Sequence, residues 1–343
     1  MKKPSALLLS AGLACGAQKA SAAPKRVQVY AHRGARAFAP ENTLPAYRTG
    51  LRIGADWMDM DVVLTEDGQV LVGHDPVLNP ALAREGGKYV APDSVVVADH
   101  SLADLKRYDV GRLDKTSAYG KFFPDQLAVD GTRMPTLDEV ARYVEDAAKG
   151  GVGYQIELKT DPSRPEVSAD PAAFAKSVYA ILKKDKLVDR AEIQAFDWRC
   201  LYALRKLDPK VKTAFLTSRD NEKGGVDDLW SSDPKVAGLW TGGKLLKDFG
   251  SLPKMVKALG GYAWEPEDAE LTKESLDEAR ALGLKVVVWT WPEKSGSIFD
   301  AAMAAKLIDW GVDGIITDDP GRLDSMLAAR GLPVPPRFDA PAP

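Results

Sequence analysis

The sequence contains few cysteines and histidines, and this shortage excludes several classes of protein. Two cysteines and three histidines occur in 343 residues, so a small disulfide-rich scaffold is excluded, and no Cys or His motif has the spacing of a zinc site. The formal net charge of −3 at pH 7 argues against a nucleic-acid partner. With 45% hydrophobic residues, the chain has the composition of a globular protein with a full core.

The N-terminal apolar run is too short to span a bilayer as a permanent helix, and we expect no stable membrane span. This run, residues 6–17, follows Lys2 and Lys3 and precedes Ala20-Ser21-Ala22. A basic start, a short apolar segment and a small-residue cleavage pattern are the layout of a secretory signal peptide. We therefore expect residues 1–22 to be removed and the protein to be exported, to the periplasm or to the exterior.

Removal of this segment changes the charge and the thiol content of the chain. It takes away three lysines and no acid, so the formal net charge goes from −3 to −6. Cys200 then remains as the one cysteine, and we expect it to be a buried apolar residue rather than a nucleophile. A lipoprotein anchored through Cys15 is the less favoured alternative, because Gly12-Leu13-Ala14 is a poor lipobox.

Beyond the leader, short apolar stretches alternate with amphipathic helical patterns. This alternation predicts a parallel sheet, and eight such units in about 300 residues predict a TIM-type (β/α)8 barrel, an α/β fold. The predicted strands are residues 27–31, 57–63, 153–159, 191–196, 211–216, 262–264, 285–290 and 314–317. The clearest helical patterns are residues 135–148, 172–184, 198–207, 273–282 and 298–310.

Two regions depart from the repeat within a single barrel domain of residues 23–332. Residues 70–73 follow the second strand closely and predict a hairpin, and residues 76–133 lack a clear βα unit. We interpret 76–133 as a small insertion after strand 2 that covers one face of the barrel, since long insertions often form lids or binding loops. The proline-rich tail, residues 333–343, is expected to be disordered or to lie on the surface.

Acidic residues recur on one face of two predicted strands. Side chains alternate along a strand, so Asp59 and Asp61 share a face, as do Gln155, Glu157 and Lys159 on the next strand. Carboxylates that point together into a barrel mouth repel each other unless a cation lies between them. The alternative is an exposed strand edge with solvated acids. Three oxygen ligands favour one divalent cation, Ca²⁺ or Mg²⁺.

Two of the three histidines stand at strand ends beside charged residues. His32 precedes Arg33, and His74 precedes Asp75. Because barrel active sites form at the carboxyl ends of the strands, this pair predicts a general acid and a general base, although a structural role is the usual one for a lone histidine. His100 has no such setting and is expected to be structural.

Positive charge at the same rim suits a phosphodiester anion. Arginine binds phosphate through two hydrogen bonds and lysine acts as a point charge, so Arg33 and Lys159 are the predicted phosphate contacts. Glu41 either supports this site from behind or merely caps the turn. Asn42 or Thr43 is the predicted N-cap of the helix that follows.

Several motifs together resemble the glycerophosphodiester phosphodiesterase family, over residues 27–322. They are AHRGARAFAPENT (31–43), GADWMDMDVVLTEDGQVLVGHD (54–75), RMPTLDEV (133–140), YQIELK (154–159), IQAFDWRCL (193–201), VVVWTW (286–291) and GVDGIITDDP (311–320). The resemblance implies a TIM-type barrel that hydrolyses glycerophosphodiesters, small-molecule head-group diesters, to sn-glycerol 3-phosphate and an alcohol. The attacking oxygen is that of water, or that of the neighbouring glycerol hydroxyl through a cyclic phosphate.

The resemblance also implies a role for individual residues. His32 and His74 match the acid–base pair, and Arg33 and Lys159 match the phosphate contacts. The positions that match the metal ligands are Asp59, Asp61 and Glu157. Trp289 and Phe196 match aromatic positions at the mouth, where they contact the substrate or only pack in the core.

One position departs from the family pattern. Asp59 stands where the family usually has glutamate, and its shorter arm leaves the number of ligands and the preferred metal open. Two other functions are weighed against hydrolysis of glycerophosphodiesters. One is a phospholipase C- or D-like diesterase acting on intact lipids, for which only Phe122-Phe123 offers an apolar rim. The other is a non-catalytic phosphodiester-binding protein, which would not need both histidines.

Overall fold

The computed structural model describes residues 26–218, 229, 231, 233, 236–290 and 297–343. The predicted signal peptide, its cleavage site and Cys15 lie outside the described residues. Within the described part of the chain, no helix combines the length and the apolarity needed to cross a membrane.

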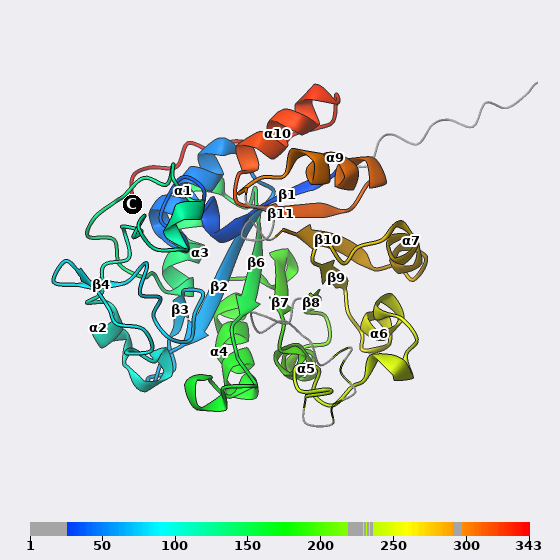
Figure 1. Ribbon diagram of the computed structural model, residues 1–343, viewed down its shortest axis with the longest axis horizontal. Coiled ribbons are helices and arrows are strands. Elements are labelled where there is room, and N and C mark those ends of the chain that lie inside the picture. Colours follow the sequence, from blue (N-terminus) through cyan, green and yellow to red (C-terminus); the bar gives the residue numbers. More distant parts are fainter. Residues whose placement is uncertain (1–25, 219–228, 230, 232, 234–235, 291–296) are drawn as a thin grey trace, which may run out of the picture.

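Eight parallel strands form a closed barrel, as the sequence predicts (Figure 1). The first strand pairs with both the second and the last, which closes the sheet. Each strand begins or ends within two residues of its predicted bounds. In order around the barrel the strands are β1 (Gln28–Ala31), β2 (Trp57–Leu64), β6 (Gly153–Leu158), β7 (Ala191–Ala195), β8 (Lys212–Thr217), β9 (Ala263–Pro266), β10 (Lys285–Trp289) and β11 (Gly314–Thr317).

Helices surround the barrel and bury the outward-facing residues of the strands. Met58, Met60 and Val62 of β2 belong to this outer core, so Asp59 and Asp61 face the interior. The longer helices are α1 (Leu44–Ile53), α3 (Leu137–Ala148), α4 (Pro171–Lys184), α5 (Trp198–Leu207), α6 (Leu252–Ala258), α7 (Lys273–Ala281), α9 (Ala301–Trp310) and α10 (Pro320–Ala329). Short 3-10 turns are η1 (His32–Gly34), η2 (Val97–Asp99), η3 (Gly120–Phe122), η4 (Pro165–Val167), η5 (Val188–Arg190) and η7 (Leu246–Asp248).

One predicted helix starts later than its sequence pattern suggests. The apolar pattern begins at residue 298, but α9 begins at Ala301 because the Asp300 side chain accepts hydrogen bonds from the backbone N–H groups of Ala302 and Met303. An aspartate in this position satisfies donors that the first helical turn leaves free.

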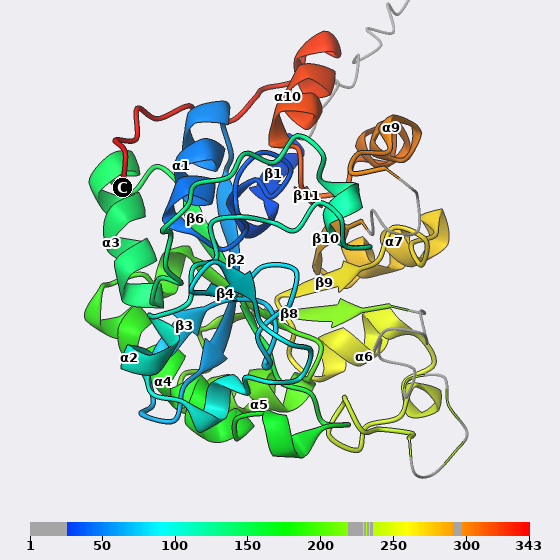
Figure 2. The same cartoon turned by 60° about the vertical axis from the view of Figure 1, so that its left-hand side comes forward.

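The segment after β2 returns along it before the chain enters the insertion. β3 (Val70–Val72) pairs antiparallel with β2, with Val62 opposite Val72. The insertion then adds the hairpin β4 (Arg84–Glu85) and β5 (Lys88–Tyr89) and the short helix α2 (Leu102–Leu105). Figures 1 and 2 both place β4 and α2 beside β3. The insertion packs there through a small cluster of its own, formed by Val63, Leu71, Leu78, Ala83, Val95, Val97, Leu105, Tyr108 and Met134.

The C-terminal tail lies on the outside of the barrel against α1 and α3. The backbone N–H of Phe338 donates to the Leu51 carbonyl at 2.9 Å. The Tyr143 hydroxyl donates to the Pro341 carbonyl at 2.6 Å. Ala340 is buried, so the tail is held at the surface by specific contacts.

Candidate active site

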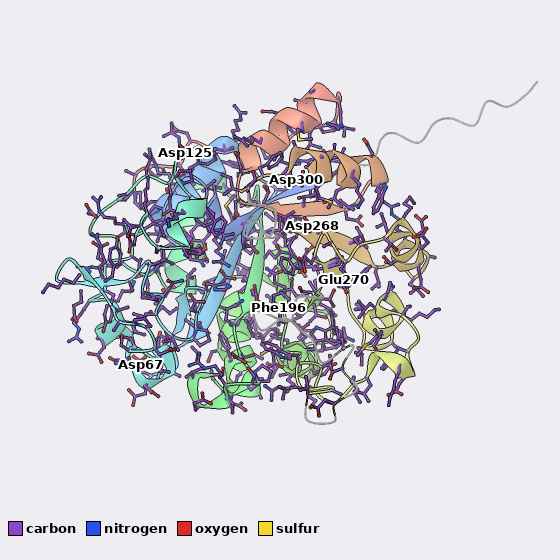
Figure 3. The ribbon with its side chains drawn as sticks, viewed as in Figure 1. Asp67, Asp125, Phe196, Asp268, Glu270 and Asp300 are labelled. Atoms are coloured by element: carbon purple, nitrogen blue, oxygen red, sulfur yellow. The ribbon has the colours of Figure 1, made fainter. Side chains whose placement is uncertain are left out.

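A cavity of about 440 Å³ opens at the carboxyl ends of the strands, where barrel enzymes place their active sites. Phe196, directly after β7, lines this cavity, and Figure 3 labels it near the centre of the view. The cavity brings together eight residues that the sequence predicts as functional, and side chains of the insertion also line it. The eight are His32, Arg33, Asp59, His74, Glu157, Lys159, Phe196 and Trp289, and the insertion contributes Pro76, Asn79 and Tyr119.

His32 is held by a carboxylate that comes from the other end of the sequence. Its Nδ1 lies 2.6 Å from Asp318 Oδ1, at the end of β11. Burial lowers the pKa of His32, and the charges of Arg36 and Arg33 add to this effect, while Asp318 opposes it. The imidazole is therefore neutral near pH 7, with Nε2 left for a bound group.

The turn that carries His32 requires a glycine. Gly34 has φ +88°, and a Cβ there would lie 2.7 Å from backbone atoms of Ala46 and Tyr47. This close approach of η1 to α1 lets the backbone N–H of Arg33 turn toward Asp59 Oδ1, to which it donates at 3.1 Å.

His74 has a similar carboxylate partner. Its Nδ1 lies 2.6 Å from Asp75 Oδ1, and Asn79 Nδ2 donates to the other oxygen of Asp75 at 3.2 Å. Burial would raise the pKa of Asp75, but the charge and the hydrogen bond of His74 outweigh burial and lower it to about 2. His74 therefore also keeps Nε2 for the cavity.

The position of His74 was predicted correctly, but for an incomplete reason. β3 runs antiparallel to the barrel strands, so its carboxyl end does not point out of the barrel mouth. The side chain reaches the rim because β2 extends past it and β3 returns, with the Gly73 N–H donating to the Asp61 carbonyl at 3.0 Å.

The three predicted metal ligands lie on the neighbouring strands β2 and β6, with Asp61 directly opposite Glu157. Their oxygens are engaged with protein groups in this structure. Gln194 Nε2 donates to Asp59 at 2.7 Å, Asn42 Nδ2 donates to Asp61 at 2.8 Å, and Lys159 Nζ donates to Glu157 at 2.7 Å.

The predicted metal site is not formed as a ligand cluster. In the part of the chain that the structure describes, no group of three acidic, histidine or cysteine side chains lies close enough together to hold a metal. The chemistry of the donor set nevertheless fits a hard cation. Burial, followed by the charge of Asp61, raises the pKa of Asp59 well above its usual value, and burial also raises the pKa of Glu157. A divalent cation between these carboxylates would relieve both effects.

Arg33 lines the cavity beside the carboxylates of β2. Its Nη1 donates to Glu41 Oε1 at 2.5 Å, and its Nε lies 3.0 Å from Asp61 Oδ2. Glu41 thus supports Arg33, which is one of its two predicted roles. The cap of α1 is Thr43, whose side chain accepts from the Ala46 N–H.

Asn42, the other predicted cap, has a different task. Its φ is +56°, and its side chain accepts from the Asp61 N–H at 3.2 Å and from the Tyr47 hydroxyl at 3.1 Å. These bonds tie the Pro-Glu-Asn turn to the inner face of β2.

The far wall of the cavity is aromatic. Phe196 and Trp289 meet edge to face, with ring centroids 5.6 Å apart, and Lys159 Nζ lies 5.7 Å from the Phe196 centroid. Trp240 lines the same wall. Both predicted aromatic residues therefore line the cavity as well as pack against each other.

Sequence reasoning missed five residues of this site. Asp318 lay within a quoted motif, but its pairing with His32 is a tertiary contact that no local pattern signals. Two of the others, Arg36 and Gln194, lie inside motifs but have no distinctive spacing there. The remaining two, Tyr119 and Trp240, lie in loops. The structure agrees with two other predictions, since His100 Nδ1 bonds the Val96 carbonyl and Cys200 is buried.

Comparison with known proteins identifies the family. The family model of glycerophosphoryl diester phosphodiesterases matches residues 32–322. A glycerophosphodiester phosphodiesterase of Bacillus subtilis is 26% identical over 305 residues, which cover 87% of this chain and 85% of that protein. Another, of Caldanaerobacter subterraneus, is 26% identical over 303 residues, covering 88% and 98%.

Solved structures share the architecture. A Silicibacter pomeroyi protein assigned to the same phosphodiesterases has a TM-score of 0.75 and 31% identity, covering 90% of this chain and 96% of that chain. An Oleispira antarctica phosphodiesterase in complex with its product sn-glycerol-3-phosphate has a TM-score of 0.61 and 21% identity, covering 88% and 97%, and shows the shared fold. The chain belongs to the glycerophosphoryl diester phosphodiesterase family.

Proposed function

We propose that the protein hydrolyses glycerophosphodiesters to sn-glycerol 3-phosphate and an alcohol by acid–base catalysis with His32 and His74. The observation that carries this proposal is one cavity that holds both His32 and His74, each with a carboxylate partner, together with Arg33 and Lys159, in a member of this family. Relatives at 26% identity over most of their length bear the name of this activity.

His32 suits the part of general base. Burial and the two nearby arginines keep it neutral, and with Nδ1 bonded to Asp318 its Nε2 accepts the proton of the attacking oxygen, of water or of the neighbouring glycerol hydroxyl. A new P–O bond forms, the P–O bond to the leaving group breaks, and His74 gives a proton to the departing alkoxide. Arg33 and Lys159 hold the phosphate oxygens during this exchange.

We also propose that activity depends on one divalent cation, Ca²⁺ or Mg²⁺, held by Asp59, Asp61 and Glu157. Such a cation stabilises the extra negative charge of the transition state when it is bound. The raised pKa values of Asp59 and Glu157 support the proposal, because burial and the charge of Asp61 raise them and a bound cation would offset both effects.

Release of sn-glycerol 3-phosphate by the purified protein tests these proposals. We expect His32→Ala and His74→Ala each to lower turnover about 10²–10⁴-fold, the usual contribution of an acid or base group. A chelator should abolish activity, and Ca²⁺ or Mg²⁺ should restore it. Near-normal turnover in both variants would refute the histidine roles, and full activity after exhaustive chelation would refute the metal.

The same assay separates the two alternatives. Faster hydrolysis of micellar phospholipid than of glycerophosphocholine would identify a lipid-directed diesterase. Tight binding of glycerophosphocholine without turnover would identify a binding protein.

Export is proposed from the sequence of residues 1–22. Mass spectrometry of the exported protein should find Ala23 at its N-terminus. A lipid-modified Cys15 at that terminus would establish the lipoprotein instead.

A further inference from the structure

Tyr119, which directly precedes η3, brings the insertion into the polar network of the cavity. Its hydroxyl donates to Glu41 Oε2 and accepts from Arg36 Nη1 at 3.0 Å. The other side chains of this network come from the barrel and are those of His32, Arg33, Arg36, Glu41 and Asp318.

The two bonds of this hydroxyl lead to the two groups that meet the phosphodiester. On one side, the second oxygen of Glu41 accepts from Arg33 Nη1 at 2.5 Å. On the other side, Arg36 Nε and Nη2 each donate to Asp318 at 2.8 Å, and Asp318 holds His32 Nδ1 at 2.6 Å. The Tyr119 hydroxyl is therefore linked by hydrogen bonds to Arg33 through Glu41. It is also linked to His32 through Arg36 and Asp318.

The neighbourhood fixes Tyr119 in this place. The Arg36 guanidinium lies 4.5 Å from the centroid of the Phe123 ring, which is fully buried. Gln126 Nε2 donates to the Arg36 carbonyl at 2.8 Å, and the Leu127 N–H donates to the Phe38 carbonyl at 2.9 Å. The insertion thus docks on the turn before α1 through a continuous segment on both sides of η3.

The hydroxyl is suited to donate at every working pH. Burial raises the pKa of Tyr119 well above its usual value, and Glu41 raises it further against the opposing charge of Arg36. A permanent donor to Glu41 restricts that carboxylate to one orientation, and a carboxylate so restricted presents one fixed oxygen to Arg33.

We propose that Tyr119 is a positioning residue through which the insertion sets the orientation of Arg33, and thereby the affinity of the cavity for the phosphate of its ligand. The effect on turnover rests on the proposed function, whereas the effect on binding of a phosphate monoester does not. The ring of Tyr119 also lines the cavity, so the insertion is a structural part of the site.

Tyr119→Phe tests the proposal because it removes only the hydroxyl. Calorimetric binding of sn-glycerol 3-phosphate should weaken roughly tenfold, since the lost bonds join charged groups. In the hydrolysis assay KM should rise more than kcat falls, and Tm should stay close to that of the native protein. The matched control is Tyr89→Phe in the same insertion, whose hydroxyl donates to the Arg112 carbonyl at 3.2 Å in an exposed position and does not line the cavity.

A double-mutant cycle with Glu41→Gln decides whether Tyr119 acts through Glu41. We expect the double variant to bind sn-glycerol 3-phosphate no more weakly than Glu41→Gln alone. Additive losses would overturn the relay, and so would equal affinities in Tyr119→Phe and Tyr89→Phe. A fall in Tm with unchanged affinity would assign Tyr119 a purely structural role. Normal binding by the native protein without any turnover would refute the proposed function and leave this inference standing.

Discussion

The two imidazoles of the cavity differ in their charged neighbours more than in their hydrogen bonds. Each bonds a carboxylate at 2.6 Å through Nδ1. His32, however, lies beside two arginines, and Arg36 binds the same carboxylate that holds the imidazole. This arrangement keeps the ring oriented by Asp318 without favouring its cation, which is what a general base near neutral pH requires.

Asp318→Asn tests this balance through the pH profile. Asp318 opposes the lowering of the pKa of His32, so its removal should lower that pKa further. The acid limb of kcat/KM should therefore move to lower pH, because His32 stays neutral further into the acid range. Loss of the ring's orientation should also reduce kcat at least tenfold, within the roughly 10²–10⁴-fold effect of losing the base.

The neighbouring Asp319→Asn is the matched control. Asp319 caps α10 by accepting from the Arg322 N–H at 3.0 Å, and asparagine caps helices equally well. Its acid limb should coincide with that of the native protein. An acid limb that Asp318→Asn leaves in place, or moves upward, would contradict the assignment of His32 as the base.

At the scale of elements, the strands were predictable and their long-range partners were not. The acids of β2 and β6 could be predicted from the sequence because side chains alternate along a strand. In β2 this alternation puts the two aspartates on one face and the apolar residues on the other. The fold followed from eight such strands. Tyr119, by contrast, lies in a segment without periodicity. Its role depends on how 76–133 packs on the barrel, which no local pattern encodes.

Helix α10 carries a buried carboxylate that titrates near neutral pH. Asp324 is 4% exposed, and neither of its oxygens has a hydrogen-bond partner. Burial, aided by the charge of Asp56, raises its pKa to about 7 against the opposing charges of Arg337 and Arg26. In the unfolded chain the group ionises near pH 4, so its penalty to folding grows between pH 4 and pH 7 and is constant above.

Asp324→Asn should remove this penalty. We expect the variant to melt a few degrees above the native protein at pH 8 and at the same temperature near pH 4, where both side chains are neutral. The measurement is the Tm of the variant and of the native protein by thermal denaturation at pH 8 and at pH 4. An equal difference in Tm at both pH values would show that ionisation of Asp324 has no part in the effect.

At the scale of the whole molecule, the two ends of the barrel have separate tasks. The carboxyl ends of the strands hold the cavity, and the tail covers the outside near the opposite end, where it packs beside Leu51 and Gly151. A Cβ on Gly151 would lie 2.5 Å from the ring of Phe338, so this glycine admits the tail. In this architecture, residues at one end of the barrel usually serve stability and residues at the other end usually serve the chemistry.

Removal of residues 334–343 should therefore lower stability without changing catalysis. Phe338 is half-buried, so loss of its packing should cost at most roughly 1.5–3 kcal/mol, the worth of fully burying one large apolar side chain. We expect a lower Tm and unchanged kcat and KM. Phe338→Ala should reproduce most of the loss. A truncated protein with altered KM would show instead that the tail communicates with the cavity.

Because β3 returns antiparallel to β2, the turn at residues 65–69 determines where His74 lies relative to His32. The turn is closed by the Thr65 N–H to the Gln69 carbonyl at 3.0 Å and by the Gln69 N–H to Thr65 Oγ1 at 2.9 Å. A strand rises about 3.4 Å per residue, so a slip of two residues would keep every side chain on its face yet move His74 about 7 Å along β2. The spacing between His32 and His74 is thus set by the length of a surface turn that lies outside the cavity they line.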